Sequence, residues 1–186
     1  IHRYGVYLYG AFGFGKTSLM ASVLNARLAQ GQSVHMLNYR HFLGRVHDTY
    51  KRRNAITRQD LIDYAVSVDV LGIDDMGDKD RIAPITDDQR DITFEMLYAR
   101  HIAKRPTIVN SNLDQIEFAN QFGGRIGQRV FELCHFVAVG GRPHEESVQG
   151  KLMGKLVCAG AMLKCSFGVA PGTLSPKAAK PCPPWK

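Results

Sequence analysis

The 186-residue sequence lacks the features of a membrane-spanning or disulfide-stabilised protein. No apolar run approaches the roughly 20 residues that a membrane-crossing helix needs, and no signal-peptide pattern opens the chain. Only Cys134 of the four cysteines lies within the first 142 residues, so nothing in that part of the chain indicates a disulfide framework. These absences lead us to expect a cytoplasmic globular protein with no membrane partner.

Proline is scarce in most of the chain and concentrated toward its end. Six of the eight prolines lie in residues 143–186, which also contain six lysines and contribute +4 to the net charge of +7. We therefore expect residues 1–142 to form one domain and residues 143–186 to form an irregular, flexible Pro/Lys-rich tail. The domain itself is only mildly basic, so charge alone gives weak support for a nucleic-acid partner.

Strand-like and helix-like segments alternate through the domain. Short apolar runs predict the strands, and apolar residues at helical spacing predict the helices between them. Because strands that are apolar on both faces are typical of covered parallel sheets, the sequence predicts an α/β fold with helices on both faces of the sheet. The expected strands are residues 4–9, 33–39, 68–73, 106–111 and 135–139, and the expected helices are residues 16–30, 40–53, 58–66, 88–104 and 124–134.

A glycine-rich loop follows the first expected strand, and its sequence GAFGFGKT matches the phosphate-loop pattern G-x-x-x-x-G-K-[ST]. The glycines let the backbone turn so that N–H groups point at phosphate oxygens, and the next helix adds the positive end of its dipole. Lys16 is expected to reach the outer phosphates of a nucleotide, and the Thr17 hydroxyl to bind Mg²⁺. The candidate nucleotide-binding residues are Gly10, Ala11, Phe12, Gly13, Phe14, Gly15, Lys16, Thr17 and Ser18.

Polar side chains at the ends of two later strands could complete such a site. The apolar segment VDVLGI leads into Asp74, placed to hold Mg²⁺ through water, and Asp75, placed to orient an attacking water. The strand PTIVNS contains Asn110 and is directly followed by Asn112, and either amide could sense a terminal phosphate. Taken singly, these residues also fit ordinary solvated turns, so their value depends on their occurring together.

Arg125 and Arg129 are four residues apart in a helical segment and therefore share one face of it. A guanidinium presented at a subunit edge can stabilise charge on the γ-phosphate of a neighbouring subunit. Without further context, two solvated surface arginines are an equally good interpretation.

In this order and at these distances, the motifs resemble those of AAA+ ATPases of the DnaC/IstB type, which are replicative helicase loaders and ATP-binding helpers of transposases. The resemblance covers about residues 4–139 and extends to HDTYKRRN, LIDYAVSVDVLGIDDMG, RPTIVNSNL and GGRIGQRVFELC. It implies a P-loop NTPase (AAA+) fold with a five-stranded parallel sheet in the order 5-1-4-3-2. It also implies ATP and Mg²⁺ as ligands, ATP hydrolysis, and ATP bound between the subunits of a homo-oligomer.

The resemblance assigns roles at the phosphate loop and the acidic pair by position. Lys16 would act on the phosphates as a catalytic residue, and Thr17 would bind Mg²⁺. Asp74 would be the second metal-binding residue, and Asp75 would be the acid that orients the attacking water.

It also assigns the amide and the arginine that complete the catalytic set. Asn112 would sense the γ-phosphate, with Asn110 as the alternative. Arg129 would act in trans as the arginine finger, and Arg125 would support it.

Two positions depart from the family pattern. Asp75 stands where AAA+ proteins commonly have Glu, and its shorter side chain reaches less far, so we expect slow hydrolysis. At the end of the domain, GGRPHEE stands in place of a Ser-Tyr-Arg-like segment that supplies a second sensor arginine. Glu145 lies near that place, and Arg142 is the candidate substitute.

Part of the tail resembles a second family. Residues 156–175, LVCAGAMLKCSFGVAPGTLS, resemble the opening of a PAAR-like, secretion-associated domain. The stretch is too short to complete a fold, so it adds no function to our prediction.

The segment HDTYKRRN places Lys51, Arg52 and Arg53 beside Tyr50. Basic side chains neutralise phosphates and an aromatic ring can stack on a base, so these residues are candidates for binding single-stranded DNA. From the residues alone, a solvated helix end is an equally good interpretation. The family resemblance favours DNA binding.

The sequence therefore predicts an ATPase that assembles on single-stranded DNA and either loads a replicative helicase or assists a transposase. Two other functions use the same loop: a small-molecule P-loop kinase, and a non-hydrolysing nucleotide-binding interaction module. The Asp74-Asp75 pair followed by Asn112 and Arg129 argues against the kinase, which would need a lid of arginines over its substrate. The short Asp75 leaves the interaction module open.

Overall fold

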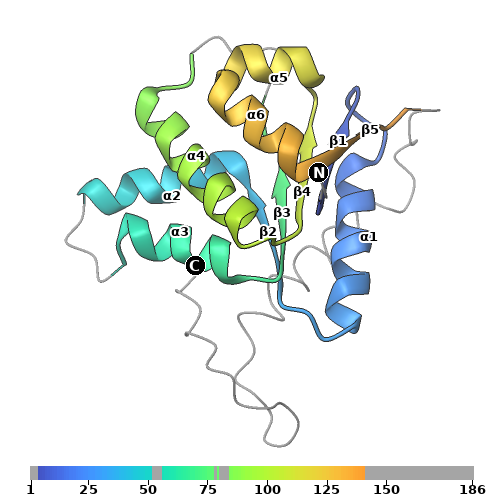
Figure 1. The fold of residues 1–186 in the computed structure, drawn as a ribbon, viewed down its shortest axis with the longest axis horizontal. Helices are drawn as coiled ribbons and strands as arrows, with labels where there is room; N and C mark the ends of the chain where they lie inside the picture. The colour runs from blue at the N-terminus through green and yellow to red at the C-terminus, as the bar shows by residue number, and fades with distance from the viewer. Residues whose placement is uncertain (1–3, 52–55, 78, 80–83, 141–186) are drawn as a thin grey trace, which may run out of the picture. The chain divides into compact units, whose positions relative to one another are not determined.

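The computed structural model describes residues 4–51, 56–77, 79 and 84–140, and its sheet contains five parallel strands (Figure 1). In spatial order the strands are β2 (Val34–Asn38), β3 (Val70–Asp74), β4 (Thr107–Ser111), β1 (Gly5–Tyr9) and β5 (Cys134–Ala138). This is the order 5-1-4-3-2 read from the other edge, so the predicted fold class is confirmed. Residues 141–186 lie outside the described part of the chain, and the division into a domain and a tail stays a prediction.

The helices cover both faces of the sheet unequally. α1 lies on one face, and the other helices lie on the opposite side (Figure 1). The chain moves from β1 out to β2 through α1 and then returns across the sheet, and right-handed crossovers in opposite directions place their helices on opposite faces. Over the described residues, none of the helices is long and apolar enough to cross a membrane. The helices are α1 (Lys16–Ala29), α2 (Tyr39–Lys51), α3 (Arg58–Ser67), α4 (Asp87–Ile102), α5 (Gln115–Phe122) and α6 (Gly124–Leu133).

Side-chain caps begin several of these helices. Thr57 caps α3 in a reciprocal capping box with Asp60, which stands where such a box commonly has Glu or Gln. Helix α5 was not among the predicted helices, and the structure explains its start in the same way. Asp114 accepts hydrogen bonds from the backbone of α5, and Glu117 reaches back to the Asp114 backbone N–H. The Asp-x-x-Glu spacing was therefore the signal that could have located α5 in the sequence.

Close contact between α1 and the sheet depends on a glycine in β3. A Cβ atom at Gly72 would lie 2.7 Å from Leu24 Cδ1 and 3.1 Å from Met20 Sδ, so a larger residue would force these two core side chains of α1 to move. This packing sets the position of the helix that begins at the phosphate loop. The buried residues of this layer are Leu8, Met20, Leu24, Val70 and Ile108.

Aromatic rings pack the opposite face of β1 against α5. The Tyr7 ring stacks on Phe136 at 4.5 Å between centroids and meets Phe118 edge-on at 5.4 Å. The Tyr7 hydroxyl donates a hydrogen bond to the Leu113 carbonyl (3.0 Å), and burial raises the pKa of this tyrosine. Tyr7 therefore ties the loop after β4 to the centre of the sheet.

Arg100, in α4, is a fully buried arginine that joins the entrances of β3 and β4. Its guanidinium donates to the carbonyl oxygens of Val68 (3.0 Å) and Asp69 (3.3 Å) just before β3. It also donates to the Pro106 carbonyl and to Thr107 Oγ1 (2.8 Å) at the start of β4. Burial lowers the pKa of Arg100 to about 9, so the guanidinium is still charged at neutral pH.

We expect Arg100→Met to lower the free energy of unfolding by at least about 3 kcal/mol, because several buried carbonyls would lose a charged donor. Denaturant unfolding followed by circular dichroism measures this loss. Arg90→Met is the matched control in the same helix, since Arg90 pairs with the exposed Asp87 (3.0 Å) and such pairs contribute at most about 1 kcal/mol. Equal losses in the two variants would contradict the role given to Arg100.

Candidate functional site

The candidate residues gather where three neighbouring strands end. β1 leads into the loop of residues 10–15, β3 ends at Asp74, and β4 ends at Ser111. β4 lies between the other two strands, and its Asn110 is in register with Leu8 of β1. Open α/β sheets bind ligands outside the carboxyl ends of their strands. The predicted site residues from β3, β4 and the loop therefore share one edge of the sheet.

The loop holds its shape through backbone conformations that favour glycine. Gly10, Gly13 and Gly15 have φ values of 147°, 83° and 77°. A Cβ atom at Gly10 would also lie 2.2 Å from the Val139 carbonyl oxygen, whereas one at Gly13 would meet open space. Gly15 is the N-cap of α1 and provides no side-chain cap, so that the first-turn N–H groups are left to point at the loop. Such a terminus suits an anion.

Lys16 is buried and directs its ammonium at the loop and at β4. Its Nζ donates to the carbonyl oxygens of Gly10 (2.8 Å) and Ala11 (2.7 Å) and to Asn112 Oδ1 (2.9 Å). Burial lowers the pKa of Lys16, and the nearby carboxylates of Asp74 and Asp75 act against this shift. The structure thus brings the predicted phosphate-binding lysine and the predicted sensor amide into direct contact.

Thr17, Asp74 and Asn110 form a second cluster beside the lysine. The Thr17 hydroxyl donates to Asp74 Oδ1 (3.1 Å), and the Asn110 amide donates to Thr17 Oγ1 (2.9 Å) and to Asp74 Oδ1. Burial raises the pKa of Asp74, and the hydrogen bonds from Asn110 and Thr17 oppose the rise. The two predicted sensor amides, Asn112 and Asn110, are thus both engaged, each by a different part of the site.

The Thr17 and Asp74 oxygens fit a magnesium ion. Mg²⁺ prefers oxygen ligands and usually keeps several of its waters. The Thr17 oxygen would be a direct ligand, and Asp74, whose Oδ1 lies 3.1 Å from it, would hold the ion through one of those waters. Across the described residues no group of three or more His, Cys, Asp or Glu side chains could hold a metal.

Asp75 leaves the strand in a conformation that the sequence did not reveal. Its φ is 58°, in the left-handed region that Asp tolerates better than most residues, and its side chain is exposed. The next residue, Met76, is buried, and its N–H donates to the Asn110 carbonyl (2.9 Å). The turn at Asp75 therefore points its carboxylate outward at the edge of the sheet where Asp74 ends.

Arg125 and Arg129 both belong to α6, which packs against α4. These two helices lie on the side of the sheet opposite α1 (Figure 1). The Arg125 guanidinium lies 4.4 Å from the centre of the Phe94 ring, and that of Arg129 lies 5.6 Å from the Tyr98 ring. The two rings are themselves stacked, with centroids 5.5 Å apart. Both arginines therefore share one helix face, as predicted, and each is held over an aromatic side chain.

Arg129 has an additional partner that the sequence analysis missed. Its guanidinium donates to Glu132 one turn later in α6, and His101 Nε2 lies 3.8 Å from the same carboxylate. The i, i+3 spacing of Arg129 and Glu132 was a visible signal. The contribution of α4 to this surface was not visible, because it depends on tertiary packing.

The predicted DNA-binding segment is described only in part. The side chain of Lys51 and the whole of Arg52 and Arg53 lie outside the described residues, as do Arg142 and Glu145. The neighbouring Tyr50 donates a hydrogen bond to Asp88 (3.1 Å).

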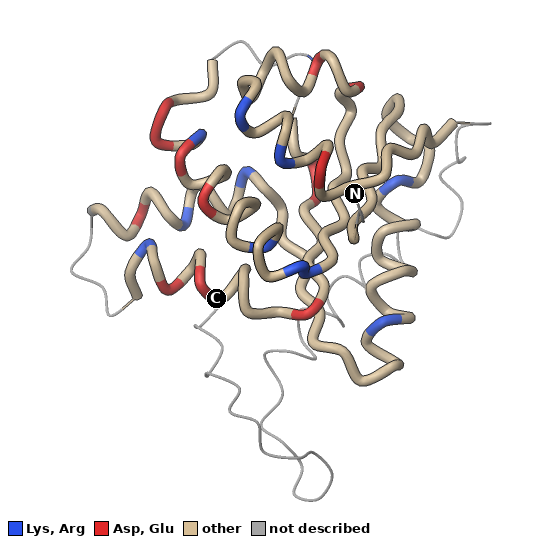
Figure 2. Tube along the Cα trace, viewed as in Figure 1, with Lys and Arg blue, Asp and Glu red and all other residues tan. Residues whose placement is uncertain are grey.

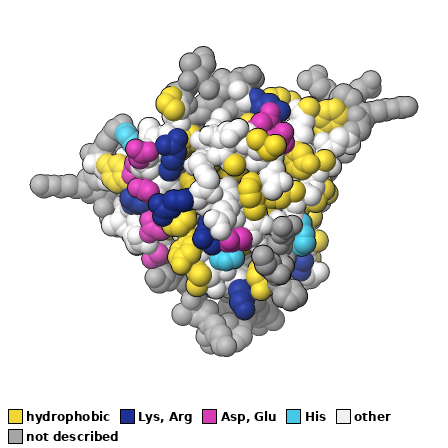
Figure 3. Space-filling view, turned by 45° about the horizontal axis from the view of Figure 1, so that its top comes forward, with side chains coloured by type: hydrophobic (Ala, Val, Ile, Leu, Met, Phe, Trp, Pro, Cys, Tyr) yellow, Lys and Arg dark blue, Asp and Glu magenta, His cyan; other side chains and the backbone are white. Residues whose placement is uncertain are grey.

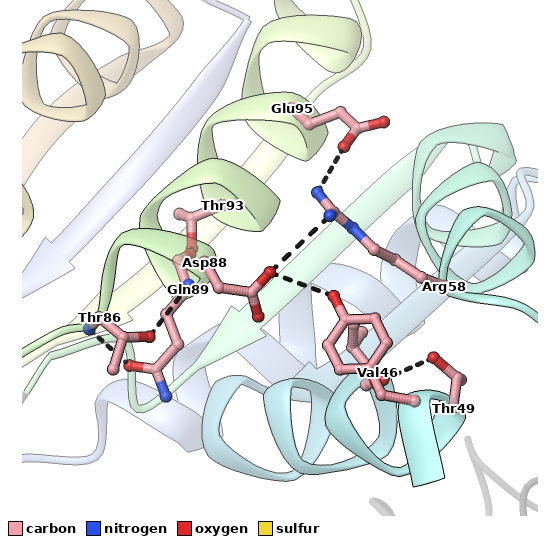
Figure 4. Close-up of polar contacts among 9 residues, drawn as sticks. Val46, Thr49, Arg58, Thr86, Asp88, Gln89, Thr93 and Glu95 are labelled. Carbon is pink, nitrogen blue, oxygen red and sulfur yellow. Dashed lines mark hydrogen bonds and ion pairs between the residues drawn. The ribbon is translucent and has the colours of Figure 1, made fainter. Parts of the chain in front are cut away.

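Acidic side chains offset the basic ones near this segment. Arg58 pairs with Glu95 (3.0 Å) and Asp88 (3.8 Å), as Figure 4 shows. Asp88 belongs to the acidic amino-terminal end of α4 that is visible in Figure 2. On the face drawn in Figure 3, basic and acidic side chains are likewise mixed. The described residues around Tyr50 therefore do not form a purely basic surface.

Comparisons with known proteins agree with this geometry, although no family model matches the chain. The replicative helicase loader DnaC of Escherichia coli K12 is 26% identical over 121 residues, which are 65% of this chain and 47% of that protein. The chain thus spans about half the length of the curated relatives that it matches.

Two solved structures show the same fold. A crystal structure of the DnaC helicase loader superposes with a TM-score of 0.64 at 18% identity, covering 73% of this chain and 78% of that one. A replication initiator DnaA bound to AMPPCP and single-stranded DNA superposes with a TM-score of 0.63 at 18% identity, covering 74% and 40%. The five-stranded sheet and its strand order are those of the P-loop AAA+ fold, as predicted.

We expect Gly10→Ala to lower the free energy of unfolding by at least about 2 kcal/mol, because the new methyl group would overlap the Val139 carbonyl where β1 meets the end of β5. Gly13→Ala is the control. Its methyl group would enter open space, so backbone strain alone should lower its free energy of unfolding, by about 1 kcal/mol. Denaturant unfolding of both variants checks the difference. A loss for Gly13→Ala as large as that for Gly10→Ala would show that strain alone governs the loop.

Proposed function

We propose that the chain is a AAA+ protein of the DnaC/IstB type, which binds ATP with Mg²⁺ and hydrolyses it in support of DNA replication. The observation that carries the proposal is the joint contact of the loop with two neighbouring strands. Lys16 contacts Asn112, and Thr17 contacts Asp74 and Asn110. A glycine-rich turn that matched the phosphate-loop pattern by chance would not be expected to contact both strands in this way.

The side chains have distinct tasks in this proposal. Phosphate oxygens replace carbonyl acceptors of Lys16 and accept from the first-turn N–H groups of α1. Thr17 and Asp74 hold Mg²⁺, which when bound neutralises charge on the phosphates. Asp75 orients the attacking water, and its short side chain limits how well it does so. Asn112, already bonded to Lys16, reads the presence of the γ-phosphate.

Arg129 is proposed to serve a neighbouring subunit. It belongs to α6 and not to the phosphate loop. Within its own chain its guanidinium lies over the Tyr98 ring and donates to Glu132. The γ-phosphate of a second copy would have to draw it away from Glu132. Arg125, four residues earlier on the same helix face, would support the contact. Hydrolysis would then require an ATP-bound homo-oligomer.

Single-stranded DNA and a replicative helicase are the proposed partners. The relative DnaC is a replicative helicase loader, and the similar DnaA structure contains single-stranded DNA. In this chain Lys51, Arg52 and Arg53 are the proposed DNA contacts. The family also includes transposition helpers, so a transposase is the alternative partner.

A non-hydrolysing nucleotide-binding interaction module is a second candidate, and two observations favour it. Asp75 is shorter than the usual glutamate, and Arg129 is already paired within its own chain. Turnover itself separates this candidate from the ATPase.

We expect the ATPase rate per subunit to rise with protein concentration in the wild type and to fall to background in Arg129→Ala. The reason is that an arginine acting in trans is available only after assembly, and such arginines contribute about 10³-fold or more. The measurement is phosphate release against protein concentration, with and without single-stranded DNA. Arg90→Ala, another surface arginine, should match the wild type, and Lys16→Ala should remove the activity.

Each other outcome of that assay identifies a different function. A rate independent of both concentration and Arg129 would overturn the assembly proposal. Transfer of phosphate to a small metabolite would identify a kinase. AMPPCP binding without any turnover of ATP would identify the interaction module.

We expect the triple replacement of Lys51, Arg52 and Arg53 by Ala to weaken binding of a labelled oligo-dT strand. It should also reduce the slope of log affinity against log salt by about 2, because each lost phosphate contact contributes about 0.7 on single strands. Fluorescence anisotropy at several KCl concentrations measures both. Arg27→Ala, at the last turn of α1 on the other face of the sheet, controls for the loss of charge in general. An unchanged slope would remove these residues from the DNA interface.

A further inference from the structure

We infer that Asn110 is a positioning residue for the magnesium ligands, with a task separate from that of Asn112. The inference rests on the proposed nucleotide function and concerns which of its parts each amide serves. Asn110 is the penultimate residue of β4, and Asn112 directly follows the strand. They nevertheless contact different groups: Asn110 binds Thr17 and Asp74, and Asn112 binds Lys16.

The hydrogen bonds of the Asn110 side-chain amide define its task. The amide nitrogen has two protons, and one is directed at Thr17 Oγ1 and the other at Asp74 Oδ1. Both partners are acceptors at these atoms, so the nitrogen of the amide and not its oxygen must face them. The Thr17 hydroxyl in turn gives its proton to Asp74. The three side chains therefore form a closed ring of donors and acceptors.

That ring leaves room for a metal. The Thr17 oxygen donates one proton and accepts one hydrogen bond, which leaves one lone pair that a cation can take. Both side-chain hydrogen bonds to Asp74 end on Oδ1, so neither of them occupies Oδ2, through which the carboxylate would hold a metal-bound water. Asn110 thus fixes the separation and rotation of the two oxygens and blocks neither of their free positions.

The backbone of Asn110 holds the same segment of chain in place. Its carbonyl accepts the Met76 N–H (2.9 Å), directly after the turn at Asp75. The side chain is buried, with 4% of the residue exposed, and its position is fixed by pairing with β1 at Leu8. A rigid, buried donor that orients metal ligands typically contributes 10–100-fold to metal affinity. Replacing the side chain removes this donor and keeps the backbone contact.

The test is a titration of AMPPCP binding by calorimetry, in EDTA and at increasing MgCl₂. For Asn110→Ala and Asn110→Leu, which keeps the volume, we expect the Mg²⁺ concentration at half effect to rise by about 10–100-fold. Affinity in EDTA should stay as in the wild type, because the phosphate contacts of Lys16 are untouched. Asn112→Ala is the matched control: it should change affinity in EDTA and leave the Mg²⁺ midpoint unaltered.

A conservative variant covers the case in which both replacements prevent folding. Asn110→Thr keeps one hydroxyl donor and suits a strand, and its Mg²⁺ midpoint should lie between those of wild type and Asn110→Ala. Wild-type midpoints in all folded Asn110 variants, or lower ones, would overturn the inference alone. If the wild type bound AMPPCP with no effect of Mg²⁺, or did not bind it, the proposed function itself would fall and the inference with it.

Discussion

The hydrogen bonds of Arg100 are the constraint on which the site depends, although they lie at the other end of the sheet. They hold Asp69, just before β3, and Pro106 and Thr107, at the start of β4, around one guanidinium. This fixes the register in which Leu71 pairs with Thr107 and Ile73 with Val109. The next pair in that register is Asp74 and Asn110. A slip of one residue would turn the side chains of β3 to the opposite face and separate Asp74 from Thr17. The buried arginine thus sets the relative positions of Asp74, five residues after Asp69, and Asn110, three residues after Thr107.

Burial acts on the two charged groups of the site in opposite directions. It lowers the pKa of Lys16 and raises that of Asp74, so each group is drawn toward its neutral form. Neighbouring groups oppose both shifts: Lys16 has the nearby acidic charges, and the Asp74 carboxylate accepts from Thr17 and Asn110. The consequence is a polar arrangement that is already ordered, since every one of these side chains has a partner of fixed position. A phosphate or a metal ion would exchange one partner for another and would not have to organise the site.

The sequence predicted those parts of the site whose chemistry is written locally. Gly10, Lys16 and Thr17 follow from the loop pattern, because the turn and the helix start need these residue types at these positions. The position of Asp74 followed from the apolar strand before it, and the resemblance supplied the strand order. Other features depend on neighbours distant in the chain. The division of work between Asn110 and Asn112 needs the register of β4 with β1 and β3, and the partners of Arg129 need the packing of α6 on α4. The left-handed turn at Asp75 is set by Met76 returning to the Asn110 backbone, which no local pattern reveals.

The pairing of Arg129 with Glu132 links the proposed assembly to the nucleotide. A guanidinium binds carboxylate and phosphate with the same planar pair of donors, so the two anions compete for it. The γ-phosphate of ATP together with its neighbours on the nucleotide carries more negative charge than a single carboxylate. In the proposed assembly, a neighbouring subunit that held ATP would therefore offer Arg129 a better partner than Glu132 does. Once the γ-phosphate left, Glu132 would again be the better partner, and that difference in affinity would weaken the contact between subunits. ATP binding would favour assembly, and hydrolysis would reverse it, without any change of fold.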